Sequence, residues 1–288
     1  MVKRRTPAKQ SDNGLAGATI AFVGAGAMGE AMIGGLLANR LVTAGAITAC
    51  DPRAPRRREL QARYGIRASA DNRAAVRGAD VVVLAVKPQI LSAVCQELRG
   101  TVRAGAVVIS IVAGARLASI ERGLGHRAVI RSMPNTPAQV GEGMTVWTAT
   151  AKVTARQRAQ AQAMLRALGL ELYAKEERFL DMATAVSGSG PAYVFLVMEA
   201  LIDAAVHLGF SPADARTLVL QTVGGSAAYA KKSERHPAEL RSQVTSPGGT
   251  TAHALRELEK GGVRSALAEA VLAAFRRSVE LGEGKKAK

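Results

Sequence analysis

Three glycines with the spacing of a dinucleotide site, Gly24, Gly26 and Gly29, directly follow the apolar run 19–23. In such a site the first glycine allows a tight turn out of a strand and the second lets the backbone approach a pyrophosphate. The third lets the next helix pack closely on the strand. N–H groups at the helix start then face the phosphates. The alternative is a flexible Gly/Ala turn, but the apolar run before the motif and the helical pattern after it favour a bound dinucleotide.

Residue Asp51 lies 22 positions after Gly29, where a carboxylate accepts a hydrogen bond from the ribose 2′-hydroxyl of NAD. It is followed by four arginines that could instead bind the 2′-phosphate of NADP through charge-assisted hydrogen bonds: Arg53, Arg56, Arg57 and Arg58. The two signals conflict, and the arginines could also form a solvated helix face. The sequence favours NADP over NAD only slightly.

Two further segments, 187–193 and 244–251, combine glycines, hydroxyl residues and a proline immediately before helical patterns. Consecutive N–H groups at a helix start form an anion site, and a small carboxylate fits it once the nucleotide is assigned elsewhere. The alternative is that both are ordinary capping loops with Ser and Thr as N-caps.

The sequence contains no His or Cys pair with the spacing of metal ligands, and its four histidines are isolated, so we expect no metal. There is no obvious acid–base dyad. Delivery of a hydride to an already protonated imine needs little proton transfer from the protein and fits that absence.

Strand and helix patterns alternate from residue 19 to residue 173 and predict a doubly wound sheet of six or more strands. After the strand at 19–23, the predicted strands are 47–51, 66–68, 80–86, 106–111, 128–131, 144–149 and 171–173. The helices between them are 27–39, 54–63, 91–98, 116–122 and 154–168. Pro88 is expected to end the strand over 80–86.

From Phe179 onward only helical patterns remain: 191–208, 212–231, 237–243, 250–260 and 263–281. The fold class is therefore α/β, a Rossmann-type doubly wound sheet followed by an all-helical C-terminal domain. Because these helices are so apolar, we expect a dimer through this half. The predicted parts are a disordered basic tail (1–17), a dinucleotide-binding domain (18–177), a helical substrate and dimerisation domain (178–283) and a second tail (284–288).

The composition, 48% apolar and 22% charged, is that of an ordinary globular protein. The net charge is +16, but aromatic residues make up 3%, so we expect a solvated basic surface and no nucleic-acid partner. Cys50 and Cys95 lie in or beside apolar segments and are expected to be reduced. Since no apolar run reaches about 18 residues and the N-terminus lacks a signal-like segment, we expect no membrane association and a cytoplasmic location.

Five motifs in order resemble the pyrroline-5-carboxylate reductase family over residues 18 to 282. They are Gly24–Gly29, Ala85–Gln89, Arg131–Pro137, Ser187–Tyr193 and Ser246–Thr251. The last two are close to specific for the family, whereas many dehydrogenases share the first. The resemblance implies NAD(P)H-dependent reduction of 1-pyrroline-5-carboxylate to L-proline. It also implies a homodimer through interleaved C-terminal helices, often assembled into a decamer.

The resemblance also implies which residues form the site. Coenzyme contacts would come from Gly24, Ala25, Gly26, Ala27, Met28, Gly29, Asn72, Ala85, Val86, Lys87, Pro88, Val112, Ala113 and Gly114, with Asp51 and Arg53 at the ribose. The substrate would be bound by Ser246, Gly248, Gly249, Thr250 and Thr251, with Glu177 bordering the site. Backbone N–H groups of Gly248, Gly249 and Thr250 would hold its carboxylate. Ser246 and Thr251 are the catalytic candidates, and the Thr251 hydroxyl would hydrogen-bond the ring nitrogen.

Two features depart from the family pattern. Asp51 stands where the family pattern has a hydroxyl or basic residue for a 2′-phosphate, so we expect NADPH as the coenzyme, with NADH as the alternative. The basic N-terminal tail is unexplained. The alternatives are a β-hydroxyacid dehydrogenase, although Lys175 and Lys231 lie in no suitable motif, and a coenzyme-binding protein without catalysis.

Overall fold

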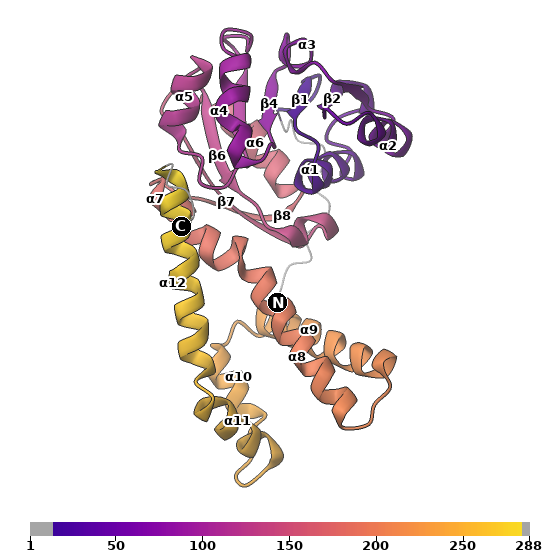
Figure 1. Ribbon diagram of the computed structural model, residues 1–288, viewed down its shortest axis with the longest axis vertical. Helices are drawn as coiled ribbons and strands as arrows, with labels where there is room; N and C mark the ends of the chain where they lie inside the picture. Colours follow the sequence, from indigo (N-terminus) through magenta and orange to yellow (C-terminus); the bar gives the residue numbers. More distant parts are fainter. Residues whose placement is uncertain (1–13, 284–288) are drawn as a thin grey trace. The chain divides into compact units, whose positions relative to one another are not determined.

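The apolar strand patterns of the first half of the chain form one eight-stranded sheet (Figure 1). In the computed structural model, which describes residues 14–283, the strand order is β3-β2-β1-β4-β5-β6-β7-β8. The strands are β1 (Ile20–Val23), β2 (Ile47–Cys50), β3 (Arg67–Ser69), β4 (Val81–Leu84), β5 (Val107–Ser110), β6 (Val129–Met133), β7 (Gly143–Ala149) and β8 (Gly169–Tyr173). Strands β1 to β6 are parallel, and β7 pairs antiparallel with β6. The predicted doubly wound sheet is confirmed, with its strand order reversing between β1 and β4.

Helices cover both faces of this sheet because its central strands are apolar on both sides (Figure 1). Alternate residues of β1, such as Phe22, pack in one core cluster with α1, α2 and α6. The intervening residues, such as Val23, pack in a second cluster with α3, α4 and α5. These helices are α1 (Ala27–Ala38), α2 (Ala54–Tyr64), α3 (Asn72–Val76), α4 (Pro88–Glu97), α5 (Leu117–Leu124) and α6 (Ala155–Arg166).

Two details at the ends of elements differ from the sequence expectation. Strand β4 ends at Leu84, and Pro88 begins α4, where the missing N–H removes no helical hydrogen bond. Residues 1–13 of the predicted tail, and the tail at 284–288, lie outside the described residues. Within 14–17, however, Leu15 is fully buried, and the Gly14 carbonyl accepts a 2.7 Å hydrogen bond from Gln160. This short stretch is part of the core, so the expectation of disorder is wrong for it.

The segment 187–193 is not an open loop before a helix. Helix α7 (Arg178–Ala183) continues through a π-helical turn (Thr184–Gly188) into α8 (Gly190–His207). The N–H of Ser189 donates to the carbonyl of Thr184 at 2.8 Å, as expected where one residue is inserted into a helix. Small Gly and Ser residues here loosen the helix without ending it, so the predicted helix-start anion site at this segment is wrong.

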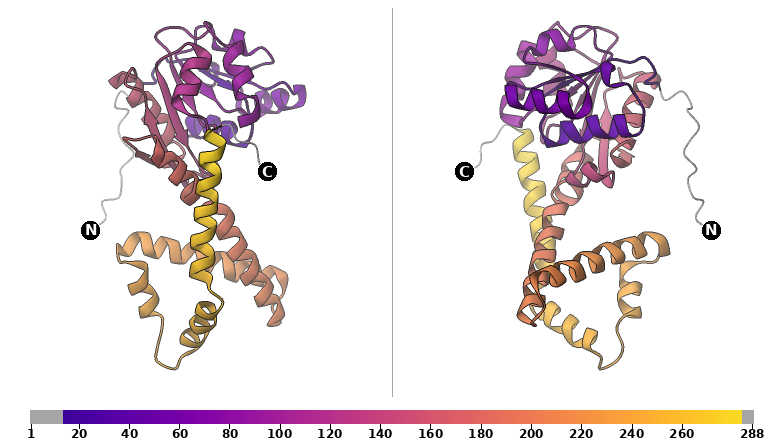
Figure 2. Two further views of the ribbon diagram at one scale, coloured as in Figure 1. Left: turned by 60° about the vertical axis from the view of Figure 1, so that its left-hand side comes forward. Right: turned by 90° about the vertical axis from the view of Figure 1, so that its right-hand side faces the viewer.

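The chain divides into two compact units, which we call the sheet unit and the helical unit. Of the described residues, 14–189 and 273–283 form the sheet unit and 190–272 form the helical unit. The helical unit contains α8, α9 (Pro212–Ser233), α10 (Pro237–Gln243), α11 (Thr250–Lys260) and the first part of α12 (Val263–Gly282). Figure 2 shows helices without strands over residues 190–272.

Large apolar side chains of the helical unit are exposed in the single chain. On α8, Phe195 and Leu196 expose 58% and 66% of their surface. Within residues 14–283, the run Arg178–His207 is long and apolar enough to cross a membrane by length and composition, which differs from the expectation of no such segment. So much exposed apolar surface calls for a partner that covers it.

Candidate functional site

The glycine-rich turn between β1 and α1 has the close contacts that its sequence predicts. Gly24 has a φ of +93°, and a Cβ there would lie 2.6 Å from the carbonyl oxygen of Ala85. A Cβ on Gly29 would lie 3.0 Å from the Gly24 oxygen. The turn is therefore packed tightly against both the loop after β4 and the start of α1.

Space and hydrogen-bond donors are available on the outer side of this turn. Gly26 is the N-cap of α1, no side chain caps the helix, and nothing lies within 4 Å of the position of a Cβ on Gly26. The intervening Ala25, Ala27 and Met28 complete the turn. The donors of the first helical turn can therefore bind a phosphate, so the residues present fit the pyrophosphate of a dinucleotide.

The Asp51 side chain, 6% exposed, is bound by Arg53 at the end of β2. The Arg53 Nε donates to Oδ1 and Nη2 to Oδ2, each at 2.9 Å, and the Arg53 backbone N–H donates to Oδ1 at 3.0 Å. These hydrogen bonds from Arg53 lower the pKa of Asp51. The carboxylate is thus ionised at neutral pH, and it holds an exposed guanidinium at the carboxyl end of β2.

Two of the other nearby arginines, Arg56 and Arg57, bind groups of the protein itself. Arg56 forms an ion pair with Glu30 and donates to the Ala25 carbonyl at 2.9 Å. Arg57 donates to the carbonyls of Asp51 and Pro52, each at 2.8 Å. Arg53 and Arg57 both bind Asp51, but Arg57 binds its backbone carbonyl, whereas the exposed Arg53 binds its carboxylate. The sequence could not show this difference.

The loops after β4 and β5 lie side by side because β4 and β5 are neighbours in the sheet. The first contains Ala85, Val86, Lys87 and Pro88, and the second contains Val112, Ala113 and Gly114. Both are at the carboxyl ends of parallel strands, where ligands of such folds bind. Asn72, the first residue of α3, donates to Glu97 Oε2 at 3.2 Å.

The Glu177 carboxylate is engaged inside the sheet unit. Its Oε1 accepts hydrogen bonds from the backbone N–H of Leu117 at 2.8 Å and from Arg131 Nη1 at 3.0 Å. Arg131 also binds Asp181 at 2.7 Å. The sequence alone predicts no individual role for Arg131 or Asp181. The signal that could have found them is a charged residue inside the apolar strand pattern at 128–131.

The segment Ser246–Thr251 leads into α11 in the helical unit and contains its first two residues, so it does start a helix, as predicted. Gly249 is the N-cap, and neither Ser246 nor a threonine caps the helix with its side chain. Gly248 has a φ of +69°, and the N–H of Gly249 donates to the Ser246 carbonyl at 3.1 Å. Because no side chain takes the capping position, N–H groups of Thr250 and Thr251 at the start of α11 are available to an anion.

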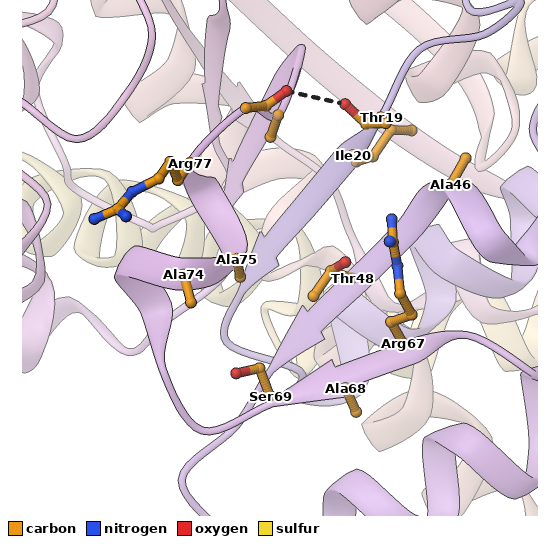
Figure 3. Close-up of a pocket in the computed structure, with 12 residues that line it drawn as sticks. Thr19, Ile20, Ala46, Thr48, Arg67, Ala68, Ser69, Ala74, Ala75 and Arg77 are labelled. Carbon is orange, nitrogen blue, oxygen red and sulfur yellow. Dashed lines mark hydrogen bonds between the residues drawn. The ribbon is translucent and has the colours of Figure 1, made fainter.

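A separate cavity of about 360 Å³ lies at the other end of the sheet (Figure 3). It is lined by residues at the amino-terminal ends of strands, including Ile20 and Arg67, and by Arg77 after α3. The Thr19 hydroxyl donates to the Gly78 carbonyl at 3.3 Å at its edge. Since the glycine-rich turn is at the carboxyl end of β1, this cavity is not part of the dinucleotide site. The described residues contain no cluster of His, Cys, Asp and Glu that could hold a metal ion.

Comparisons with known proteins agree in both halves of the chain. A family described as pyrroline-5-carboxylate reductase dimerisation matches residues 177–281, and one described as NADP oxidoreductase coenzyme F420-dependent matches residues 19–114. The pyrroline-5-carboxylate reductase of Synechocystis is 46% identical over 264 residues, covering 92% of this chain and 98% of the relative. That of Pseudomonas aeruginosa is 46% identical over 265 residues, covering 92% and 97%.

Solved structures give the same result. The pyrroline-5-carboxylate reductase of Coxiella burnetii has a TM-score of 0.84 at 38% identity, covering 94% of this chain and 99% of that one. The Plasmodium falciparum pyrroline carboxylate reductase, solved with NADP bound, has a TM-score of 0.85 at 31% identity, covering 92% and 98%.

Proposed function

The chain belongs to the pyrroline-5-carboxylate reductase family, and on that premise we propose which of its residues carry the reaction. The enzyme is an NAD(P)H-dependent oxidoreductase that reduces the cyclic imine 1-pyrroline-5-carboxylate to L-proline, in proline biosynthesis. The observation that carries this function is near-full-length identity of 46% to named reductases, together with a glycine-rich turn built for a dinucleotide.

The coenzyme is placed along the carboxyl ends of β2, β1, β4 and β5. Its pyrophosphate lies on the turn Gly24–Gly29, because a helix start without a side-chain cap offers free N–H groups. Its adenosine ribose lies beside Asp51 and Arg53, near Asn72. Its nicotinamide half lies on the other side of β1, against the loops 85–88 and 112–114. The strand order reverses between these two halves, as in other dinucleotide sites.

The substrate is placed on the segment Ser246–Thr251. Its carboxylate accepts hydrogen bonds from backbone N–H groups of Gly248, Gly249 and Thr250. The Gly249 N–H already donates to Ser246, so Gly248 and Thr250 make this contact with the least rearrangement. We also assign Glu177 to the substrate-binding residues; within the sheet unit its carboxylate holds Arg131 and the start of α5.

The protein acts mainly by positioning the substrate next to the coenzyme. The bound coenzyme supplies the hydride. The Thr251 hydroxyl hydrogen-bonds the ring nitrogen and orients the imine carbon, with Ser246 supporting the same segment. Holding two reactants in a reactive geometry lowers the barrier, and a hydrogen bond that keeps the imine protonated makes its carbon a better hydride acceptor, so no acid–base dyad is required. Residues 18–177 form the coenzyme-binding domain in this scheme, and residues 178–283 form the substrate and dimerisation domain.

The coenzyme preference follows from two side chains with opposite effects. The enzyme uses NAD(P)H. Asp51 favours the free 2′-hydroxyl of NADH, whereas Arg53 favours the 2′-phosphate of NADPH. We assign NADPH as the better coenzyme, with NADH accepted, because Arg53 is exposed and Asp51 is already bound by it.

A second copy of the chain covers the apolar helices. The chain forms oligomers through the region that matches the dimerisation family, residues 177–281. That region includes Phe195 and Leu196 and the whole of the apolar run Arg178–His207. A homodimer, further assembled into a decamer, therefore covers this surface and leaves no role for a membrane. We place the enzyme in the cytoplasm and assign no nucleic-acid partner.

The direct test is to mix the purified protein with NADPH, then with NADH, and to add 1-pyrroline-5-carboxylate while following the absorbance of the reduced nicotinamide. Oxidation that depends on the imine, with L-proline as product, is the expected result. Two outcomes would overturn the assignment. Oxidation of a β-hydroxy acid by NAD(P)⁺, without activity on the imine, would favour a β-hydroxyacid dehydrogenase. Coenzyme binding without any turnover would favour a coenzyme-binding protein without catalysis.

A further inference from the structure

The motif Arg131–Pro137 has no assigned role, although it contains a charged side chain in a buried strand. Arg131 lies in β6 between Ile130 and Ser132, both buried, and its own side chain is 3% exposed. Removing a guanidinium from water costs much free energy unless charged and hydrogen-bonding partners surround it. Its partners therefore indicate what it holds in place.

Those partners form a compact neutral cluster of two cations and two carboxylates. Arg131 donates to Glu177 at 3.0 Å and to Asp181 at 2.7 Å. Asp181, 2% exposed, is also bound by the Ser278 hydroxyl at 3.1 Å and lies 3.4 Å from a nitrogen of Arg116. The cluster joins β6, α7 and the last turns of α12, which lie beside α7 (Figure 1).

Two contacts connect this cluster to the loop after β5. Glu177 accepts the backbone N–H of Leu117, which begins α5 just after the loop 112–114. Arg116, at the N-cap of α5, packs so closely on α12 that a Cβ on Gly282 would lie 2.8 Å from its Nε. A Cβ on Gly114 would likewise lie 3.0 Å from the Cβ of Leu281.

The neighbouring motif residue Ser132 acts on the other end of that loop. Its hydroxyl donates to the Ser110 carbonyl at 3.1 Å, and the Ser110 hydroxyl accepts the N–H of Val112 at 3.2 Å. The loop 112–114 thus lies between β5 and Leu117. Ser132 holds the end at β5 through Ser110, and Arg131 holds the end at Leu117 through Glu177.

We propose that Arg131 and Asp181 are positioning residues for the coenzyme: through Glu177, Arg116 and Ser278 they hold the loop 112–114 in the geometry that the nicotinamide half requires. A buried ion pair adds little stability compared with apolar side chains of the same volume. Its hydrogen bonds are directional, so they fix the orientation of the groups that it binds more strictly than apolar contacts do. The inference rests on the proposed position of the nicotinamide half at this loop.

The experiment measures NADPH binding without substrate, by fluorescence titration, in the full-length protein. Arg131→Lys keeps the charge but cannot bind both carboxylates in one plane. Asp181→Asn keeps the size but removes one charge. We expect each variant to raise the Kd for NADPH by about five- to twentyfold, the loss of one or two directed contacts. At saturating NADPH, the KM for the imine should change less than twofold.

A matched control separates positioning from general loss of stability. Asp80→Asn also removes a carboxylate of the sheet unit, one that binds Arg103 at 2.6 Å and the N–H of Thr19 at 2.8 Å. It lies at the amino-terminal end of the sheet, so it should lower the melting temperature and leave the Kd for NADPH unchanged. If Arg131→Lys and Asp181→Asn also lower only the melting temperature, the inference is wrong.

Two further variants keep the test decisive. Ser278→Ala removes one hydrogen bond to Asp181 and leaves both charges, so it should fold even if the charge variants do not, and it should raise the Kd two- to threefold. An unchanged Kd in this variant contradicts the inference. Gly24→Ala tests the coenzyme site itself. If the parent binds NADPH and Gly24→Ala binds it equally well, the proposed coenzyme site fails, whatever the cluster does.

Discussion

The guanidinium of Arg53 binds both carboxylate oxygens of Asp51, at 2.9 Å each, although the two side chains favour different coenzymes. Asp51 fits a ribose with a free 2′-hydroxyl, and Arg53 fits one that carries a phosphate. Because each side chain is bound by the other, a change at either position should shift the coenzyme preference, and in opposite directions.

Replacing Asp51 by serine should increase the ratio of kcat/KM for NADPH to that for NADH by roughly tenfold, the scale of one charge-assisted hydrogen bond. Arg53→Ala should shift the ratio toward NADH, because it leaves the carboxylate free to accept from the 2′-hydroxyl. Steady-state rates with both coenzymes measure this. Glu59→Gln removes an exposed carboxylate from α2, the helix that follows Arg53, and should have no effect. An unchanged ratio in both Asp51 and Arg53 variants would show that the pair does not contact the ribose.

Thr251→Ala should reduce transition-state stabilisation by about 1–3 kcal/mol, the scale of a hydrogen bond to a charged group, and the ratio of kcat/KM values for the imine measures this loss. The Kd for NADPH should stay unchanged because the coenzyme lies on other loops. Thr222→Ala is a suitable control, since the Thr222 hydroxyl only donates to the Leu218 carbonyl on α9. Full activity of Thr251→Ala would remove this hydroxyl from the reaction.

Gly24→Ala should lower the free energy of unfolding by about 2–4 kcal/mol and abolish coenzyme binding. The added Cβ meets the Ala85 oxygen at 2.6 Å, and the φ of +93° is unfavourable for alanine. Gly45→Ala is the control, because nothing lies within 4 Å of its Cβ position. Chemical denaturation measures both, and Gly45→Ala should lie within about 0.5 kcal/mol of the parent.

The two thiols should resist alkylation in the native protein at pH 8. Burial raises the pKa of Cys50 to about 12 and that of Cys95 to about 11, so neither forms the reactive thiolate there. In the unfolded chain both regain an ordinary pKa near 8.5 and react. Because the native state keeps both thiols protonated where the unfolded chain ionises them, the free energy of unfolding decreases as the pH rises from about 8.5 through the native pKa values of about 11 for Cys95 and about 12 for Cys50. Mass spectrometry after iodoacetamide treatment, with and without denaturant, measures the labelling.

Leu196→Asp should weaken the dimer, because it places a charge on an apolar face that a second copy covers. Val140→Asp is the control: Val140 is 78% exposed, but it belongs to the sheet unit. Sedimentation at equal concentrations should show a smaller species for Leu196→Asp only. A Leu196→Asp protein with the parent's mass would place the subunit contact elsewhere.

The sequence by itself determined the elements and the coenzyme class. Strand and helix periodicity, and the glycine spacing at 24, 26 and 29 that marks a tight turn, are local properties that neighbouring residues decide. The same holds for the start of α11 at Gly249 and Thr250, where small residues and a proline precede a helical pattern.

Only the tertiary structure decided what depends on partners far apart in the chain. Arg131 and Asp181 are 50 positions apart and meet because β6 and α7 pack together. The uninterrupted helical path through Thr184–Gly188 depends on packing too, since a Cβ on Gly188 would lie 2.7 Å from Met133. Four arginines follow Asp51, and the sequence does not distinguish between them because all four are the same residue type. The fold orients them differently: Arg56 binds Glu30, and Arg53 binds the Asp51 carboxylate.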